Sequence, residues 1–109
     1  MKTSLRRLGL SALLLAGCAL DARVEAIQAL TGDPVNGESV YFNICEECHA
    51  QDLNGTTKGP SLLILVPRID DDKILRTIIG GNDEMPAFGD DLLDQEIADA
   101  LSYVRQEAP

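Results

Sequence analysis

The apolar residues of this chain recur at the spacing of α-helices. Two stretches carry an apolar stripe of the kind that lines one face of a helix. The first stripe consists of Ile74, Leu75, Ile78 and Ile79, and the second of Ile97, Ala100, Leu101 and Val104, with Tyr103 beside it. The apolar run at residues 62–66 is short and lies between two prolines, so we interpret it as a packed loop or helical turn rather than a strand. The pattern predicts an all-α fold.

Polar residues and glycines mark where these helices begin and end. Asp33-Pro34 predicts a helix start, because Asp accepts hydrogen bonds from free backbone N–H groups and Pro fits the first turn. This helix would run into Cys45. The acidic residues 70–72 predict the start of the next helix, which Gly80-Gly81 ends. The last helix is expected to begin near residues 91–94.

The first residues have the order of an export signal. Three basic residues precede an apolar run at residues 8–16, which is too short to span a bilayer, since a span needs roughly 20 apolar residues. Residues 15–18, L-A-G-C, resemble the lipobox of bacterial lipoproteins, which implies that Cys18 is acylated and becomes the new N-terminus. Ordinary cleavage after Ala22 and an uncleaved anchor are the alternatives. We expect a signal peptide at residues 1–17, a linker at 18–32 and one domain at 33–109, exported to the periplasmic side and tethered to a membrane.

Composition and charge narrow the class of protein further. A chain of 109 residues with two Tyr, two Phe and no Trp builds a thin core. Such domains usually need disulfide bonds, a metal or a cofactor to be stable. Nine basic and 18 acidic residues give a net charge of −9, which argues against nucleic-acid binding. Without residues 1–17, six basic residues remain, and 6 − 18 = −12. This acidic surface favours a partner with a basic docking face, or serves solubility alone.

Residues 45–49 read C-E-E-C-H and hold two of the three cysteines and the only histidine. A structural zinc site usually takes four ligands, which this domain does not offer. A redox pair would need a strand–helix–strand context, and a plain disulfide would leave His49 unexplained. C-x-x-C-H is the attachment motif of c-type haem. The thiols of Cys45 and Cys48 lie one helical turn apart and can add to the two vinyl groups of the porphyrin, and His49 can then bind the iron.

Met85 is the candidate ligand for the second face of the iron. Cytochromes that carry electrons usually close this face with Met. Met85 is the only methionine after the expected signal, and it lies 85 − 49 = 36 residues after His49. Polar residues 82–84 precede it and Pro86 follows, which favours a loop position. A methionine packed in the core is the alternative.

The order of these residues resembles that of small bacterial class I c-type cytochromes, a family with one haem. The likeness covers about residues 35–105. Gly37, Tyr41 and Cys45 follow the family's spacing of glycine, aromatic residue and first cysteine. Residues 58–62 resemble its G-P-x-L element, residues 85–88 its distal-ligand loop, and residues 100–104 its closing helix, which in the family crosses the first helix near Gly37.

The resemblance implies a small cytochrome c fold of three or more helices packed around one covalently bound haem c. It also implies that the carbonyl oxygen of Pro60 accepts the other ring N–H of His49 and so orients this ligand. Three positions depart from the family. Leu93 stands where the family often has a capping Ser or Thr, so we expect Asp91 to cap the last helix. Glu46 and Glu47 place two negative charges at the haem edge where partners often dock.

We therefore interpret the chain as an electron-transfer haemoprotein without enzymatic activity. His49 and Met85 would be the axial iron ligands, and the partners would be redox proteins rather than a small-molecule substrate. The first alternative is a fixed cytochrome subunit of a periplasmic dehydrogenase or terminal oxidase. The second alternative is a haem enzyme or sensor with an open iron, against which Met85 argues.

Overall fold

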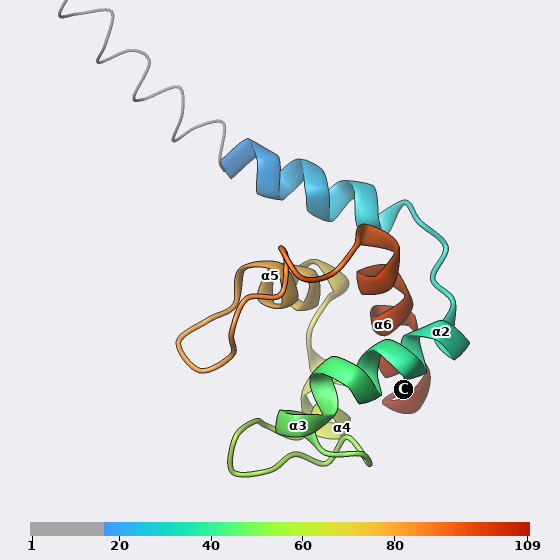
Figure 1. Cartoon of the computed structure of the whole chain (residues 1–109), viewed down its shortest axis with the longest axis vertical. Coiled ribbons are helices and arrows are strands. Elements are labelled where there is room, and N and C mark those ends of the chain that lie inside the picture. The colour runs from blue at the N-terminus through green and yellow to red at the C-terminus, as the bar shows by residue number, and fades with distance from the viewer. Residues whose placement is uncertain (1–16) are drawn as a thin grey trace, which may run out of the picture.

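The computed structural model describes residues 17–109, and most of these residues fold into helices, which are joined by loops (Figure 1). Within this range the only β-type pairing is an isolated bridge between Thr56 and Gly59. The all-α prediction is confirmed. The helical elements are an N-terminal helix at residues 17–28, α2 (Pro34–Val40), η1 (Tyr41–Cys45), α3 (Glu46–His49), α4 (Leu62–Leu65), η2 (Val66–Arg68), α5 (Asp71–Gly80) and α6 (Asp94–Glu107).

The predicted helix from Pro34 to Cys45 exists, but it changes type along its length. Asp33 caps α2, and its carboxylate accepts the backbone N–H of Val35 at 2.9 Å. The chain then widens into the π-helical segment η1 and continues directly into α3. Such π segments within helices are often found at functional sites. Here η1 and α3 together contain the whole C-E-E-C-H sequence.

Helices α2 and α6 cross in close contact at Gly37. A Cβ atom on this residue would overlap the backbone carbonyl oxygen of Asp99 and would lie 2.9 Å from the Cβ atom of Tyr103. Only glycine permits this approach. The crossing expected from the family resemblance is therefore present.

A buried carboxylate also joins these two helices. Asp99, which is 3% exposed, accepts hydrogen bonds from the backbone N–H of Asp33 at 2.8 Å, from Asn36 at 2.7 Å and from Gln95 at 2.9 Å. Burial opposes ionisation, but these hydrogen bonds outweigh it and lower the pKa of Asp99. The ionised carboxylate thus ties the start of α2 to α6.

The start of α6 differs from the prediction. The expected cap by Asp91 is wrong: the helix begins after Leu93, whose backbone N–H donates to the carboxylate of Glu96 at 2.9 Å. Asp91 instead belongs to the preceding turn, where its backbone N–H donates to the carbonyl of Phe88 at 3.0 Å. A glutamate one turn into the helix therefore takes the place of the missing Ser or Thr cap.

The expected linker at residues 18–32 is mostly part of the folded unit. Val24 and Ile27 of the N-terminal helix are 2% and 1% exposed and belong to the main core cluster. Arg23 pairs with Asp94 of α6 at 2.8 Å, and Asp21 pairs with Arg76 of α5 at 2.8 Å. Apolar residues at helical spacing, Leu20, Val24 and Ile27, make this packing possible.

The expected signal peptide lies outside the described residues except for Gly17. Within residues 17–109, no helix has both the length and the apolar character needed to cross a bilayer. The candidate lipidation residue, Cys18, is exposed near the start of the N-terminal helix.

Replacing Gly37 with Ala should lower the free energy of unfolding of the haem-loaded protein by about 1–3 kcal/mol, because the new methyl group forces α2 and α6 apart. Urea unfolding followed by circular dichroism measures this loss. The control is Gly80→Ala at the end of α5, where a Cβ atom meets nothing within 4 Å. This change should be neutral or stabilise by up to about 1 kcal/mol. Equal stability of the two variants would contradict the close crossing.

Candidate functional site

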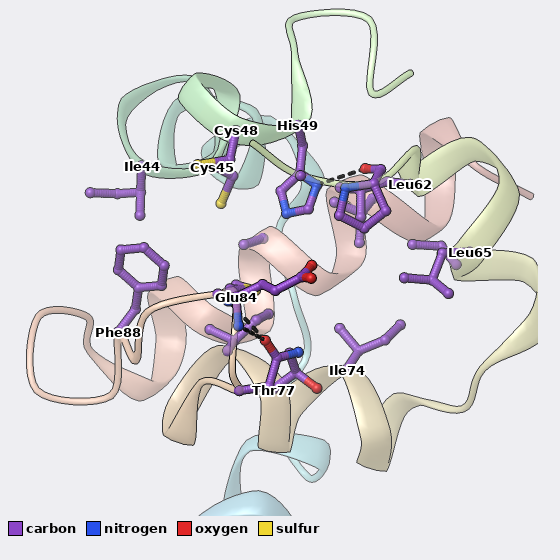
Figure 2. Close-up of a pocket in the computed structure, with 18 of the residues that line it drawn as sticks. Ile44, Cys45, Cys48, His49, Leu62, Leu65, Ile74, Thr77, Glu84 and Phe88 are labelled. Carbon is purple, nitrogen blue, oxygen red and sulfur yellow. Dashed lines mark hydrogen bonds between the residues drawn. The ribbon is translucent and has the colours of Figure 1, made fainter. Parts of the chain in front are cut away.

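A cavity of about 240 Å³ lies between the C-E-E-C-H segment and helix α5 (Figure 2). Its walls are mainly aliphatic side chains from η1, α4, η2, α5 and α6. The aliphatic lining residues are Ile44, Leu62, Leu65, Val66, Ile69, Ile74, Ile78, Ala100 and Val104. A cavity with such walls fits an apolar ligand body.

The two cysteines and the histidine of the motif line this cavity together. Figure 2 shows Cys48 and His49 extending into the cavity from the same helical turn. Both Cys45 and Cys48 are free thiols, so no disulfide joins them in the described part of the chain. Burial, and then the neighbouring Cys48, raise the pKa of Cys45 to about 11. This sulfur is therefore a protonated thiol unless a covalent bond is formed with it.

The orientation of His49 is set by one hydrogen bond. Its ring is 7% exposed, and Nδ1 lies 2.9 Å from the carbonyl oxygen of Pro60. A carbonyl oxygen only accepts, so Nδ1 carries the proton and donates it. In the neutral imidazole this leaves Nε2 without a proton, which is the form that binds a metal.

Further hydrogen bonds hold the turn that carries His49. The hydroxyl of Tyr41 donates to the carbonyl of Ala50 at 2.6 Å, and the hydroxyl of Thr56 donates to the carbonyl of Cys48 at 2.7 Å. Burial is the main cause of a raised pKa at Tyr41, so this hydroxyl remains a donor above the usual pH of tyrosine ionisation. The backbone N–H of Gly55 closes the turn by donating to the carbonyl of His49 at 2.9 Å.

Met85 lines the same cavity from the loop between α5 and α6. The side chain of Asn82 accepts the backbone N–H groups of Glu84 at 3.0 Å and Met85 at 2.8 Å, and its own backbone N–H donates to the carbonyl of Met85 at 2.9 Å. Gly81 begins this loop at φ +70°, a conformation that favours glycine. These bonds hold the backbone of Met85 in place. Its side chain belongs to neither core cluster of the described residues and lies at the cavity wall.

These groups fit a haem. The cavity combines an apolar body with two thiols, one imidazole and one thioether, which is the donor set of a covalently attached porphyrin with nitrogen and sulfur axial ligands. Within residues 17–109, no group of three or more His, Cys, Asp or Glu side chains gathers to hold a bare metal ion. The structure therefore brings together Cys45, Cys48, His49, Pro60 and Met85, and leaves Cys18 outside the site.

Three charged residues of this cavity were not predicted from the sequence. Lys58, Lys73 and Glu84 all line it. Lys58 precedes the G-P-x-L element, and Lys73 lies in the first turn of α5, one residue before the apolar stripe that faces the cavity. The apolar periodicity of the sequence does not reveal them, because their place at the cavity depends on how the segments pack together.

The comparisons with known proteins agree with this site. A family model described as cytochrome C oxidase, cbb3-type, subunit III matches residues 32–104. Cytochrome c6 of Diacronema lutheri is 35% identical over 82 residues, which cover 71% of this chain and 99% of that protein. Cytochrome c-555 of Methylococcus capsulatus is 28% identical over 106 residues, which cover 95% of this chain and 84% of that protein.

Two solved structures are also similar. The c-type cytochrome XoxG from Methylobacterium extorquens AM1 matches 66% of this chain with a TM-score of 0.61 and 32% identity. Cytochrome cL from Hyphomicrobium denitrificans matches 66% of it with a TM-score of 0.59 and 27% identity. The match spans 48% and 45% of these two proteins, so this chain corresponds to about half of each.

Proposed function

Because this chain belongs to the class I c-type cytochromes and binds haem c covalently, we propose that it carries single electrons through an iron ligated by His49 and Met85. One observation carries the proposal: His49 of α3 and Met85 of the α5–α6 loop line the same apolar cavity. In Figure 2, His49 and Glu84, the neighbour of Met85, lie on facing sides of this cavity. A ligand set that closes both faces of the iron suits an electron carrier rather than an enzyme.

Each residue of the site has a distinct task in this proposal. Cys45 and Cys48 hold the porphyrin through thioether bonds, and the bound haem supplies an iron that alternates between the ferric and ferrous states. His49 binds through Nε2 while its Nδ1 proton remains on the hydrogen bond to Pro60. Met85 excludes other ligands from the second face, and its thioether favours the ferrous state.

The N-terminal helix supports a membrane tether at Cys18. Cleavage before Cys18 would keep the helix from residue 18 onward, together with the ion pair between Asp21 and Arg76. Cleavage after Ala22 would cut through the helix and remove Asp21. Of the two cleavage sites, the one before Cys18 is thus compatible with an intact helix, and acylation there would attach the domain to a membrane on the periplasmic side.

The tether would also be short. Leu20 already packs against the core, only two residues beyond Cys18. A domain held this closely stays near the bilayer surface, so its partners would be membrane proteins or proteins that dock at the membrane. This observation, with the match to the subunit III family model, favours a fixed cytochrome subunit of a respiratory complex as the second candidate.

The charge of the chain supports a partner with a basic docking face. Glu46 and Glu47 follow the first cysteine directly, and the ion pair of Glu47 with Lys58 is long, at 3.4 Å, and exposed. Such an exposed pair contributes little to stability. Together with Glu46, the pair leaves one net negative charge beside the first cysteine, which would steer a basic partner toward this edge of the haem.

Replacing Met85 with Ala should remove the weak long-wavelength absorption band of ferric iron–sulfur ligation, lower the reduction potential and let carbon monoxide bind the ferrous iron. Visible spectroscopy and potentiometric titration check these three changes. The control is Glu84→Ala, which alters the same loop and the same cavity but keeps the sulfur. An unchanged spectrum in the Met85 variant would show that another group binds the iron.

Replacing Cys18 with Ser should move the protein from the membrane fraction to the soluble periplasmic fraction, because the acylation site is lost. Fractionation followed by haem staining of a denaturing gel measures the distribution. Asp21→Ala is the control: it removes the ion pair to Arg76 but keeps Cys18, so this variant should stay with the membrane. Sedimentation of the Cys18 variant with membranes would reject the lipid tether.

Electron transfer to the physiological partner should slow as salt rises from about 0.01 M to about 0.1 M, since the Debye length falls from about 30 to about 10 Å. The double variant Glu46→Lys/Glu47→Lys should weaken this dependence without changing the haem spectrum. Glu25→Lys/Glu107→Lys makes the same change in net charge away from the cavity and should preserve most of the dependence. Stopped-flow spectroscopy measures the rate of electron transfer for all three proteins. A rate that does not change with salt in the unmodified protein would mean that the acidic surface serves solubility alone.

A further inference from the structure

We propose that Lys73 is the counterion of a haem propionate. Haem carries two propionate carboxylates on the edge of the ring opposite the two vinyl-derived carbons. The position of the cysteines therefore determines which end of the cavity receives the carboxylates. The inference rests on the proposed thioether bonds of Cys45 and Cys48, and on the charged residues that line the cavity.

The end of the cavity away from the cysteines is formed by α4, η2 and the start of α5. Figure 2 shows Leu65 and Ile74 on the side opposite Cys48. Lys73 precedes Ile74 in the first turn of α5 and also lines the cavity. Its ammonium group, on a flexible side chain, can thus reach a carboxylate at this end.

Lys58, the other lysine of the cavity, lies at the wrong end. The neighbouring Gly59 packs against Cys48: a Cβ atom on Gly59 would lie 2.9 Å from the carbonyl oxygen of Cys48. Lys58 also has a partner, since its ammonium group lies 3.4 Å from the carboxylate of Glu47. It is therefore placed beside the thioether edge rather than the propionate edge.

Lys73 has no ion-pair partner within the described residues, although three aspartates directly precede it in sequence. Each aspartate is engaged elsewhere. Asp70 accepts the backbone N–H of Lys73 at 2.9 Å, Asp71 pairs with Arg105 at 2.8 Å, and Asp72 pairs with Arg76 at 2.8 Å. The ammonium group of Lys73 thus remains available for an anion that the chain does not supply.

This assignment matters because of the charge of the domain. Two more carboxylates placed in a strongly acidic protein repel their surroundings, and a nearby cation offsets this repulsion. A cation at the propionate also favours the ferrous state, because reduction adds one negative charge to the haem. Lys73 therefore sets part of the reduction potential.

The test compares Lys73→Gln, Lys73→Arg and Lys58→Gln in the haem-loaded protein, with covalent attachment checked first by haem staining of a denaturing gel. Loss of the stain would reject the thioether proposal itself. Lys73→Gln should disfavour reduction by up to about tenfold, which is about 59 mV for one electron. Lys73→Arg should keep the potential of the unmodified protein, and Lys58→Gln should shift it less than Lys73→Gln does.

A second measurement reports the contact directly. In the ferrous protein, proton NMR should show nuclear Overhauser contacts between the side chain of Lys73 and a propionate methylene group. A merely structural role of Lys73 would produce neither these contacts nor the difference between the Gln and Arg variants. Absence of the contacts, contacts with Lys58 instead, or equal potential shifts in the two Gln variants would overturn the proposal.

Discussion

An apolar cavity that the chain leaves open is the constraint on which the rest of this structure depends. The described residues form two core clusters, and the partly buried Ile78 and Leu101 contact both of them. Between these clusters lies a space of about 240 Å³ walled by aliphatic side chains. An unfilled space of this kind is costly, because its walls lose both packing contacts and protection from water. Covalent haem fills it, so the cofactor completes the core and forms the functional centre at once.

Several hydrogen bonds and one close helix crossing hold the walls of this cavity. The close crossing at Gly37 and the buried carboxylate of Asp99 fix α2 against α6, and this determines where the C-E-E-C-H turn begins. On the other side, Arg105 of α6 donates to the carbonyl of Ile69 at 2.7 Å and pairs with Asp71 at 2.8 Å, which holds the segment before α5. One helix therefore positions both the histidine wall and the start of α5.

Much of this arrangement was predictable because the decisive residues are local in sequence. Cys45, Cys48 and His49 are brought together by one helical turn, and α5 and α6 follow directly from their apolar stripes. Met85 could be chosen because it is the only methionine after the expected signal and has loop-forming neighbours. The carbonyl of Pro60 required the family resemblance, since no local pattern relates it to His49.

The failures have physical reasons as well. A linker is predicted at residues 18–32 because their apolar residues are sparse, yet Val24 and Ile27 are buried in the core. The cap of α6 by Glu96 was missed because a backbone N–H can be satisfied from inside the helix as well as from the residue before it. The lysines of the cavity depend on tertiary packing, which periodicity does not reveal.

The proposed electron-carrier function depends on the bond between Met85 and the iron, and one NMR measurement tests this bond most directly. The chain has two methionines, Met1 and Met85, and only Met85 would remain after removal of the predicted export signal. With ¹³C-labelled methionine methyl groups, the ferrous protein should show one methyl signal shifted far upfield by the porphyrin ring current, because a ligating thioether places its methyl group over the ring. A Met85 methyl signal at the ordinary position of an unligated methionine would contradict the account.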